Sequence, residues 1–228
     1  MKIYLKTGEV SNEIILCQSD MEGATTMSKE LIKRLYFFST FDGGIYTVAN
    51  STNAKFIINM KKENLDYVEA IEKTLNELEI GCSIKDRADY NTDGFIRQPQ
   101  VRLESRNHPK LTTIQNRIYI DGRKVIDPHM LTLLDAEALA IIFMADGSRV
   151  YDKRSPNAKP NITLNTKGFS YGDNFLLKKA IKEILDLEFN IQRQNNYWYL
   201  RLRAKDIEKF DKIVGPFIFN SFSYKLGR

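Results

Sequence analysis

An internal repeat constrains the fold of this chain more than any other feature of its sequence. Three residue types recur in the same order in the two halves, as the pairs Asp42 and Asp146, Asn59 and Asn165, and Lys124 and Lys225. The members of these pairs are separated by 104, 106 and 101 positions, respectively. Because three matches in one order at nearly constant spacing rarely arise by chance, we expect two similar structural units.

The hydrophobic pattern predicts the same series of elements in both units: helix, strand, strand, helix, strand, strand, helix. The ranges expected in the first unit are a helix at 28–41, strands at 45–48 and 55–60, a helix at 64–78 and strands at 82–88 and 96–105. Those in the second are a helix at 135–145, strands at 149–151 and 161–166, a helix at 171–187, strands at 189–194 and 198–203, and a helix at 204–214. Gly and Pro between the halves predict a connector, so the expected organisation is an N-terminal extension (1–27), a first unit (28–120), a linker (121–133) and a second unit (134–228).

Cysteine and histidine are too scarce for several kinds of site. Cys17 and Cys82 are the only cysteines and His108 and His129 the only histidines, which excludes a disulfide scaffold, a cysteine-rich zinc module and a multi-histidine metal site. No apolar run approaches the ~20 residues of a membrane span, and the amino terminus lacks the apolar core of a signal peptide. We therefore expect no membrane partner and an intracellular, reducing compartment, either the cytoplasm or, for an organelle-encoded protein, an organelle matrix.

The charge of the chain is small and unevenly distributed. The net charge is +5, yet residues 1–133 carry 18 basic and 18 acidic side chains, so the whole excess lies in residues 134–228. This distribution is compatible with basic strips that contact a polyanion, and equally with a soluble protein that has one slightly basic half.

The two Asp-Gly pairs lie at the ends of apolar helices, where a carboxylate is unfavourable. An Asp at a helix C-terminus opposes the helix dipole, at a cost of a few tenths to ~1 kcal/mol, unless a positive charge lies beside it. Two copies of this arrangement favour a shared cation, and carboxylate oxygens are ligands that suit Mg²⁺. The alternative is that each Asp-Gly pair only forms a turn. Because both helices are apolar on nearly all sides, we expect them to pack together, with both Asp residues at one end of the pair.

The residues of these helices identify a family resemblance. Residues 139–147, LAIIFMADG, resemble the nine-residue signature of the LAGLIDADG homing endonucleases, and residues 35–43 are a weaker copy. Residues 162–170 and 224–226 also resemble the single-chain, two-motif members of the yeast mitochondrial omega-intron type. The resemblance covers residues 28–228.

This resemblance implies an α+β fold of two pseudo-symmetric αββαββα units, whose antiparallel sheets form a saddle over DNA. It implies that Asp42 and Asp146 bind catalytic Mg²⁺ or Mn²⁺ with the backbone carbonyls of Phe41 and Ala145. It further implies that Lys124 and Lys225 assist catalysis as the basic residues near the end of each unit. Asn59 and Asn165 would orient water or contact the DNA backbone, or they are ordinary polar residues at strand ends.

Polar strips on the predicted strands are candidates for contact with DNA. Gln and Arg suit bidentate contacts to base edges. In the first unit such residues occupy alternate positions of a predicted strand, at Gln98, Gln100, Arg102 and Arg106. With the resemblance, a similar strip is expected in the second unit at Arg193, Tyr199, Arg201 and Arg203. Contacts to phosphates are expected from Lys153, Arg154 and Lys167. The alternative for any of these side chains is plain solvent exposure.

The function that the resemblance implies is site-specific hydrolysis of both strands of DNA at a long target site, which leaves short 3′ overhangs. The protein would act as a monomeric homing endonuclease with double-stranded DNA as its partner. One alternative is a maturase that assists the splicing of its host intron RNA. Another is a DNA-binding regulator that does not cleave, for which loss of one acidic residue would be expected; both are present.

Overall fold

The computed structural model describes residues 29–87, 98–151 and 159–227. The predicted N-terminal extension and the expected cap at Ser28 lie outside the described residues, as do Lys153 and Arg154. Among the described helices, none is long and apolar enough to cross a membrane.

The first unit contains the expected series of seven elements. They are α1 (Lys29–Phe41), β1 (Gly44–Thr47), β2 (Ala54–Lys61), α2 (Leu65–Glu77), β3 (Cys82–Arg87), β4 (Gln100–Ser105) and α3 (Pro109–Ile118). A two-stranded hairpin, β5 (Tyr119–Ile120) and β6 (Arg123–Lys124), and a 3₁₀ turn at Met130–Leu133 lead to the second unit.

The second unit repeats the series. Its elements are α4 (Ala136–Asp146), β7 (Gly147–Val150), β8 (Asn161–Leu164), α5 (Tyr171–Leu185), β9 (Phe189–Gln194), β10 (Tyr197–Leu202) and α6 (Ile207–Val214). Residues 215–227 then form two short 3₁₀ turns, and we call them the C-terminal segment. Helix α4 begins as predicted, because the carboxylate of Asp135 accepts a hydrogen bond from the backbone N–H of Ala138 at 2.8 Å.

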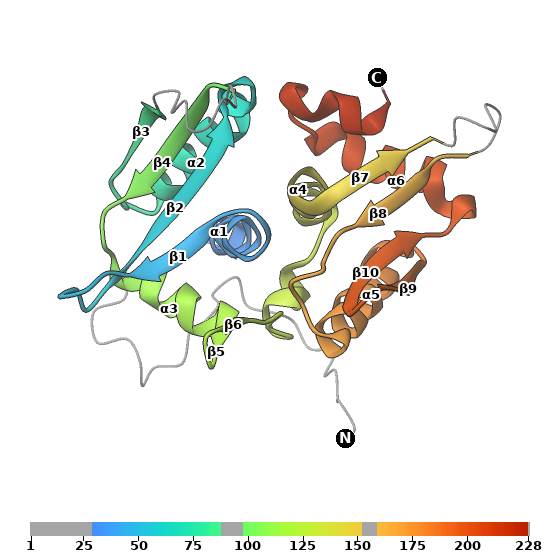
Figure 1. The fold of residues 1–228 in the computed structure, drawn as a ribbon, viewed down its shortest axis with the longest axis horizontal. Helices are drawn as coiled ribbons and strands as arrows, with labels where there is room; N and C mark the ends of the chain where they lie inside the picture. The colour runs from blue at the N-terminus through green and yellow to red at the C-terminus, as the bar shows by residue number, and fades with distance from the viewer. Residues whose placement is uncertain (1–28, 88–97, 152–158, 228) are drawn as a thin grey trace.

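The two four-stranded sheets have the same topology. Their strand orders are β1-β2-β4-β3 and β7-β8-β10-β9, and every neighbouring pair is antiparallel. Figure 1 shows one sheet on each side of a central pair of helices. The repeat expected from the sequence is therefore present as two copies of one fold.

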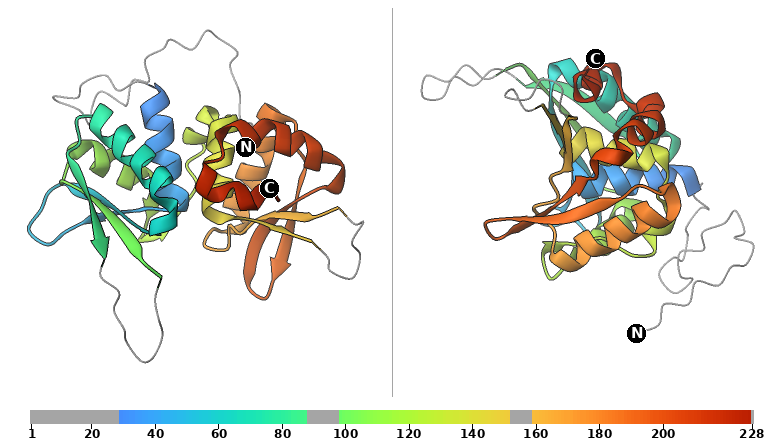
Figure 2. Two further views of the ribbon diagram at one scale, coloured as in Figure 1. Left: turned by 90° about the horizontal axis from the view of Figure 1, so that it is seen from above. Right: turned by 90° about the vertical axis from the view of Figure 1, so that its right-hand side faces the viewer.

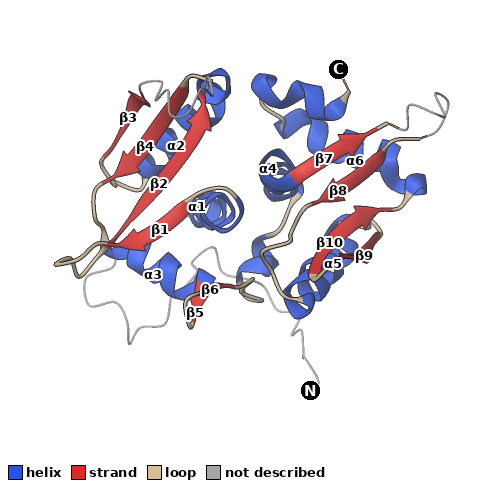
Figure 3. Ribbon diagram, viewed as in Figure 1, coloured by secondary structure: helices blue, strands red, loops and turns tan. Residues whose placement is uncertain are grey.

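Helices α1 and α4 form the centre of the molecule and pack against each other (Figures 1 and 3). Residues 138–144 of α4 are all buried, as expected for a helix that is apolar on all sides. Two bulky side chains of α1 are buried in the core: the rings of Phe37 and Phe41 stack with centroids 6.3 Å apart, and Phe41 also contacts Phe169 of the second unit.

Within the described residues, each sheet has one face against helices and one face on which no helix lies, which we call its free face. Helices α2 and α3 contact strands of the first sheet, and α5 contacts β9 and β10. In the left view of Figure 2, strands project on one side of the molecule and α2 and the C-terminal segment lie on the other. The alternation in β4 follows from this arrangement, because Val101 and Leu103 are buried while Gln100 and Arg102 are partly exposed on the opposite face.

Candidate DNA-cleavage site

The two Asp-Gly pairs lie where each central helix turns directly into a strand. The N–H groups of Asp42 and Gly43 both donate to the carbonyl of Phe38, at 3.1 and 2.8 Å, which ends α1. Glycine is required after each Asp for a steric reason. A Cβ at Gly43 would lie 2.3 Å from the Phe56 ring, and one at Gly147 would lie 2.3 Å from the carbonyl oxygen of Phe143.

Asn59 and Asn165 occupy equivalent positions opposite the two Asp residues. In the second unit the N–H of Asn165 donates to the carbonyl of Asp146 at 2.7 Å. In the first unit, continuing the pairing of Gly44 with Ile57 by two residues brings Asn59 opposite Asp42. The near-constant spacing of these residues in the sequence thus reflects equal positions in the two sheets.

The two predicted lysines bind the carbonyl ends of the two central helices. The ammonium group of Lys124 donates to the carbonyls of Ser39, Thr40 and Gly43, at 3.1, 3.0 and 3.1 Å. That of Lys225 donates to the carbonyls of Phe143 and Met144, at 3.2 and 2.5 Å. Each lysine therefore supplies a positive charge at the negative end of a helix dipole that also carries an Asp.

The two carboxylates lie close enough to affect each other. Burial, followed by the charge of Asp42, raises the pKa of Asp146 to about 6, although both lysines act against this shift. Burial also raises the pKa of Asp42, and it lowers the pKa of each lysine in spite of the two carboxylates. The fold therefore brings together all four residues that the sequence indicated as catalytic.

Tyr67 is a component of the site that sequence reasoning missed. It lies on α2, is fully buried, and its hydroxyl is near enough to the Asp42 carboxylate to favour the charged form of that group. Neither this hydroxyl nor Oδ2 of Asp42 makes a hydrogen bond of regular geometry, although both atoms are buried. In the sequence Tyr67 is indistinguishable from an apolar core position of an amphipathic helix, so no local signal could have identified it.

The donor groups at this site fit a divalent cation. Oδ2 of Asp42 is buried and accepts no hydrogen bond of regular geometry from the described residues, and the nearby Asp146 carboxylate has a raised pKa, so both would gain from a cation between them. Within the described ranges no cluster of three or more His, Cys, Asp or Glu side chains is placed to hold a metal. The coordination shell of a metal bound here would thus be completed by water, by the backbone carbonyls of Phe41 and Ala145, or by substrate oxygens, which is the usual situation for Mg²⁺.

The free face of the first sheet carries the predicted residues and several that were missed. In the strand register Asn59 and Lys85 lie on either side of Arg102, and Lys61 and Arg87 lie on either side of Gln100. Because directly paired residues point to the same face, these side chains form one polar, basic surface. The charge of Arg102 is compensated locally, since its guanidinium lies 3.1 Å from Glu104.

The free face of the second sheet differs from the prediction at one residue. Tyr199 and Arg201 are on it, paired with Gln192 and Asn190. Arg193 pairs with Trp198, which has the same orientation as the buried Leu200, so the expectation that Arg193 shares the face of Arg201 is wrong. Its guanidinium instead lies over the Trp198 ring, 5.4 Å from the centroid.

The physical reason for this error is the two-residue turn between β9 and β10. Gln194 pairs directly with Tyr197, and Asn195 adopts a φ of 54°, as in the common two-residue hairpins. Such a turn makes odd-numbered residues of one strand face even-numbered residues of the other. A strip drawn through odd positions on both sides of the turn therefore changes face.

The remaining predicted contact residues lie beyond the strands. Gln98 precedes β4, Arg106 and Arg203 follow β4 and β10, and Lys167 lies in the turn after β8; all four are exposed. Arg203 forms an ion pair with Glu188 at 2.5 Å. The structure therefore places these residues just beyond the ends of the strands that form the two free faces.

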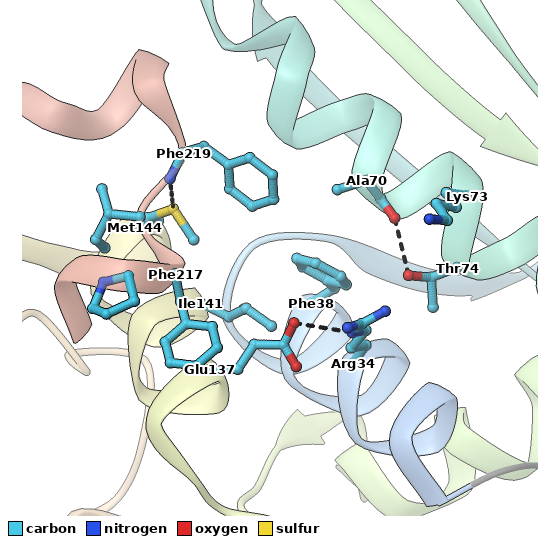
Figure 4. A pocket seen from close by; sticks show the side chains of 12 residues that line it. Arg34, Phe38, Ala70, Lys73, Thr74, Glu137, Ile141, Met144, Phe217 and Phe219 are labelled. Atoms are coloured by element: carbon cyan, nitrogen blue, oxygen red, sulfur yellow. Dashed lines mark hydrogen bonds and ion pairs between the residues drawn. The ribbon is translucent and has the colours of Figure 1, made fainter. Parts of the chain in front are cut away.

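A cavity of about 330 Å³ lies elsewhere, between α1, α2, α4 and residues 216–219, and neither Asp lines it (Figure 4). Its charged groups are partly neutralised, because Arg34 pairs with Glu137 at 3.0 Å. The paired Asp and Lys residues described above lie where the central helices meet the sheets, and none of them lines this cavity.

Comparison with known proteins places the chain in a family. The model of the family described as LAGLIDADG DNA endonuclease matches residues 41–210, which is well over half of the chain. The chain belongs to the LAGLIDADG DNA endonuclease family. The resemblance read from the signature residues is thereby confirmed, and α1 and α4 are the two LAGLIDADG helices.

Individual relatives support this assignment over different lengths. An uncharacterised protein from Methanocaldococcus jannaschii is 32% identical over 125 residues, which cover 54% of this chain and 47% of the relative. The chain thus spans about half the length of that relative. A probable intron-encoded endonuclease from Wickerhamomyces canadensis is 24% identical over 205 residues, which cover 89% of this chain and 86% of the relative.

The LAGLIDADG fold is also found in solved structures. The homing endonuclease I-WcaI, bound to its DNA recognition sequence, matches with a TM-score of 0.74 and 21% identity, over 91% of this chain and 90% of that chain. The predicted fold class, two pseudo-symmetric units with four-stranded antiparallel sheets, is therefore confirmed.

Proposed function

We propose that this LAGLIDADG protein is a site-specific endonuclease that hydrolyses one phosphodiester bond in each strand of double-stranded DNA, as a monomer with a divalent metal. The observation that carries this proposal is the paired arrangement at the ends of α1 and α4. An Asp lies at the end of each helix, each end binds a lysine, and burial together with the charge of Asp42 raises the pKa of Asp146. Two matched sites are what cleavage of two strands requires.

The protein residues have separable roles in this proposal. Asp42 and Asp146 would hold the metal, with the carbonyls of Phe41 and Ala145 as further oxygen ligands. When bound, the metal, Mg²⁺ or Mn²⁺, would supply an activated water and stabilise charge on the phosphate. The structure of a variant of I-DmoI, which has a similar fold, was solved with its nicked target DNA in the presence of Mn. This structure supports a divalent ion here. Lys124 and Lys225, fixed on the helix ends, would neutralise charge that develops on the phosphate.

The two free sheet faces would bind the DNA on either side of this site. Their exposed Arg, Lys and Gln side chains suit phosphates and base edges, and positions such as Arg201, Gln100 and Tyr199 lie on strands rather than on loops. Rigid strands hold such side chains in a fixed spatial pattern, which is what recognition of a long target sequence requires.

The test is cleavage of a randomised duplex library in Mg²⁺ or Mn²⁺, followed by sequencing of the cut ends. We expect a single long consensus with short 3′ overhangs, and no products in EDTA. An Asp146→Asn variant should lose double-strand cleavage while it binds the recovered target within a few-fold of the unsubstituted protein. Glu69→Ala, at an exposed position of α2, serves as the control that should still cleave.

Other outcomes would contradict the proposal in distinct ways. Tight, sequence-specific binding without cleavage in any divalent metal would favour a DNA-binding regulator. Stimulation of intron splicing without DNA cleavage would favour a maturase. Cleavage by Asp146→Asn at the unsubstituted rate would show that this carboxylate is not part of the reaction.

A further inference from the structure

The C-terminal segment carries Lys225 but is held by the first unit. The hydroxyl of Ser221 donates to Oδ1 of Asp66 at 2.5 Å, and the Ser221 N–H donates to Oδ2 of the same carboxylate at 3.2 Å. Asp66 lies in the first turn of α2, 155 positions away in the sequence. Because one carboxylate binds both groups of Ser221, it fixes the backbone of this segment as well as one side chain.

Aromatic contacts reinforce the same junction. The ring of Tyr67, next to Asp66, packs edge-on against Phe219 and Phe222, with centroids 5.7 and 5.3 Å apart. The ammonium group of Lys225 in turn lies over the Phe222 ring, 5.4 Å from its centroid. The N–H of Phe219 also donates to Sδ of Met144 on α4 at 3.4 Å (Figure 4). The segment is therefore seated between α2 of the first unit and α4 of the second.

The equivalent arrangement occurs at the other lysine. Asp173 lies in the first turn of α5, in the second unit, and its Oδ1 accepts the N–H of Ile126 at 3.0 Å. Ile126 follows Lys124 by two residues. Oδ2 of Asp173 accepts the N–H and the hydroxyl of Ser170, at 3.0 and 2.6 Å, so the carboxylate is itself held in place.

Each lysine is thus fixed from both units. Its ammonium group binds the LAGLIDADG helix of one unit, while the chain that carries it is held by an Asp at the start of the second helix of the other unit. We propose that Asp66 and Asp173 are positioning residues that act across the interface, Asp66 on Lys225 and Asp173 on Lys124. This inference rests on the endonuclease function proposed above.

The physical argument concerns the flexibility of the chain that bears each lysine. Residues 215–227 form only short 3₁₀ turns, and Lys124 lies in a two-residue strand, so neither lysine is fixed by regular structure of its own. A displacement of about 1 Å at a catalytic group is enough to slow a reaction by about 100-fold. A carboxylate from the other unit removes this freedom only when the two units are correctly docked.

The experiment measures the rate at which each strand of the recovered target is nicked, under single-turnover conditions with Mg²⁺ and saturating enzyme. Lys225→Met and Lys124→Met first establish which strand depends on which lysine. We then expect Asp66→Ala to slow the Lys225-dependent strand by about tenfold and the other strand by less than about twofold. Asp173→Ala should show the reverse selectivity, and Glu69→Ala, on the same helix as Asp66, should change neither rate.

Three further measurements separate positioning from a general loss of structure. Asp66→Asn keeps an acceptor for Ser221 and should recover most of the lost rate. In a protein that already carries Lys225→Met, Asp66→Ala should reduce the nicking rate little further, because both substitutions act through the same ammonium group. In the metal-free proteins, hydrogen exchange of the Ser221 amide should be faster in Asp66→Ala. If Asp66→Ala does not fold, Ser221→Ala removes the 2.5 Å bond alone and should show the same strand selectivity, to a smaller degree.

The inference and the underlying function fail in different ways. If the unsubstituted protein cuts no DNA, the endonuclease function fails, while the exchange measurement still tests whether Asp66 holds the segment. If the protein cuts and Lys225→Met slows one strand, but Asp66→Ala slows both strands equally or neither, the positioning role is wrong. Additive effects of Asp66→Ala and Lys225→Met would equally overturn it.

Discussion

Lys33 of α1 lies with its ammonium group 2.6 Å from Oδ2 of Asp135, the residue that caps α4. The same ammonium group lies 2.9 Å from Glu137 and contacts Glu30. Lys33 is only 3% exposed, so one buried cation joins the beginnings of the two LAGLIDADG helices. The opposite ends of these helices carry Asp42 and Asp146, so this cluster fixes the alignment of the pair at the end remote from the candidate site.

Replacing this lysine should therefore destabilise the protein. We expect Lys33→Met to lower the free energy of unfolding by about 2 kcal/mol at pH 7, because it leaves carboxylates without their buried cation; their partial exposure keeps the effect below the roughly 3–5 kcal/mol of a fully buried pair. Urea unfolding measures this change. Lys29→Met, at an exposed position of the same helix, should change stability by less than about 0.5 kcal/mol, and an equal loss in both variants would contradict the role of Lys33.

The stability of the metal-free protein should depend on the ionisation of Asp146. Its pKa is about 6 in the folded protein and near the ordinary 3.8 when unfolded, so the folded state binds the proton more tightly. Stability from this group is therefore greatest at low pH and is lost as the pH rises from about 4 through 6. We expect Asp146→Asn to be more stable than the unsubstituted protein by up to about 3 kcal/mol at pH 7.5. Urea unfolding in EDTA at pH 4.5 and 7.5 measures this, and a difference that does not grow with pH would contradict it.

The hydroxyl of Tyr67 makes the two sites unequal, because it lowers the pKa of Asp42 against the effect of burial and has no such effect on Asp146. We expect Tyr67→Phe to slow nicking of one strand by roughly three- to tenfold, since it removes a group that favours the charged carboxylate. Strand-specific single-turnover assays measure this effect.

A second buried tyrosine provides the control. The hydroxyl of Tyr36 accepts the N–H of Asp127 at 3.0 Å, so Tyr36→Phe should cost about 1 kcal/mol of stability without selecting a strand. Equal slowing of both strands by Tyr67→Phe would mean that its hydroxyl acts only on the fold.

Binding to DNA should depend more on Arg201 than on Arg102. The charge of Arg102 is already paired with Glu104 at 3.1 Å, whereas the guanidinium of Arg201 donates to the neutral amide of Asn161. We therefore expect Arg201→Ala to weaken binding more than Arg102→Ala does, and to reduce the slope of log K against log salt by about 1 if the contact is to a phosphate. Fluorescence anisotropy at several salt concentrations measures both quantities.

Arg193→Ala is the matched control for these two variants. Because Arg193 lies over Trp198 on the other side of the sheet, its removal should leave affinity within about twofold. A loss as large as that of Arg201→Ala would show that the DNA reaches both sides of this hairpin. Equal losses from Arg201→Ala and Arg102→Ala would contradict the effect of local charge compensation.

The sequence by itself determined the two-unit architecture and the four central residues of the site. Amphipathic and apolar periodicity depends on neighbouring residues, so it is visible in one dimension. The repeat placed Asp42 with Asp146 and Lys124 with Lys225, because equal offsets in two copies of one fold become equal positions in space. The Asp-Gly pairs were also readable, although the reason for the glycines, the rings of Phe56 and Phe143, was not.

Only the tertiary structure decided which distant residues meet. Asp66 and Ser221 are 155 positions apart and have ordinary polar identities, and Tyr67 has the periodicity of a core residue. The face of Arg193 depended on a two-residue turn that reverses which positions point outward. Contacts of this kind depend on how helices dock on sheets and on strand register. No local sequence pattern encodes either, because many segments of similar polarity could make the same contact, and only the packing of the two units selects one of them.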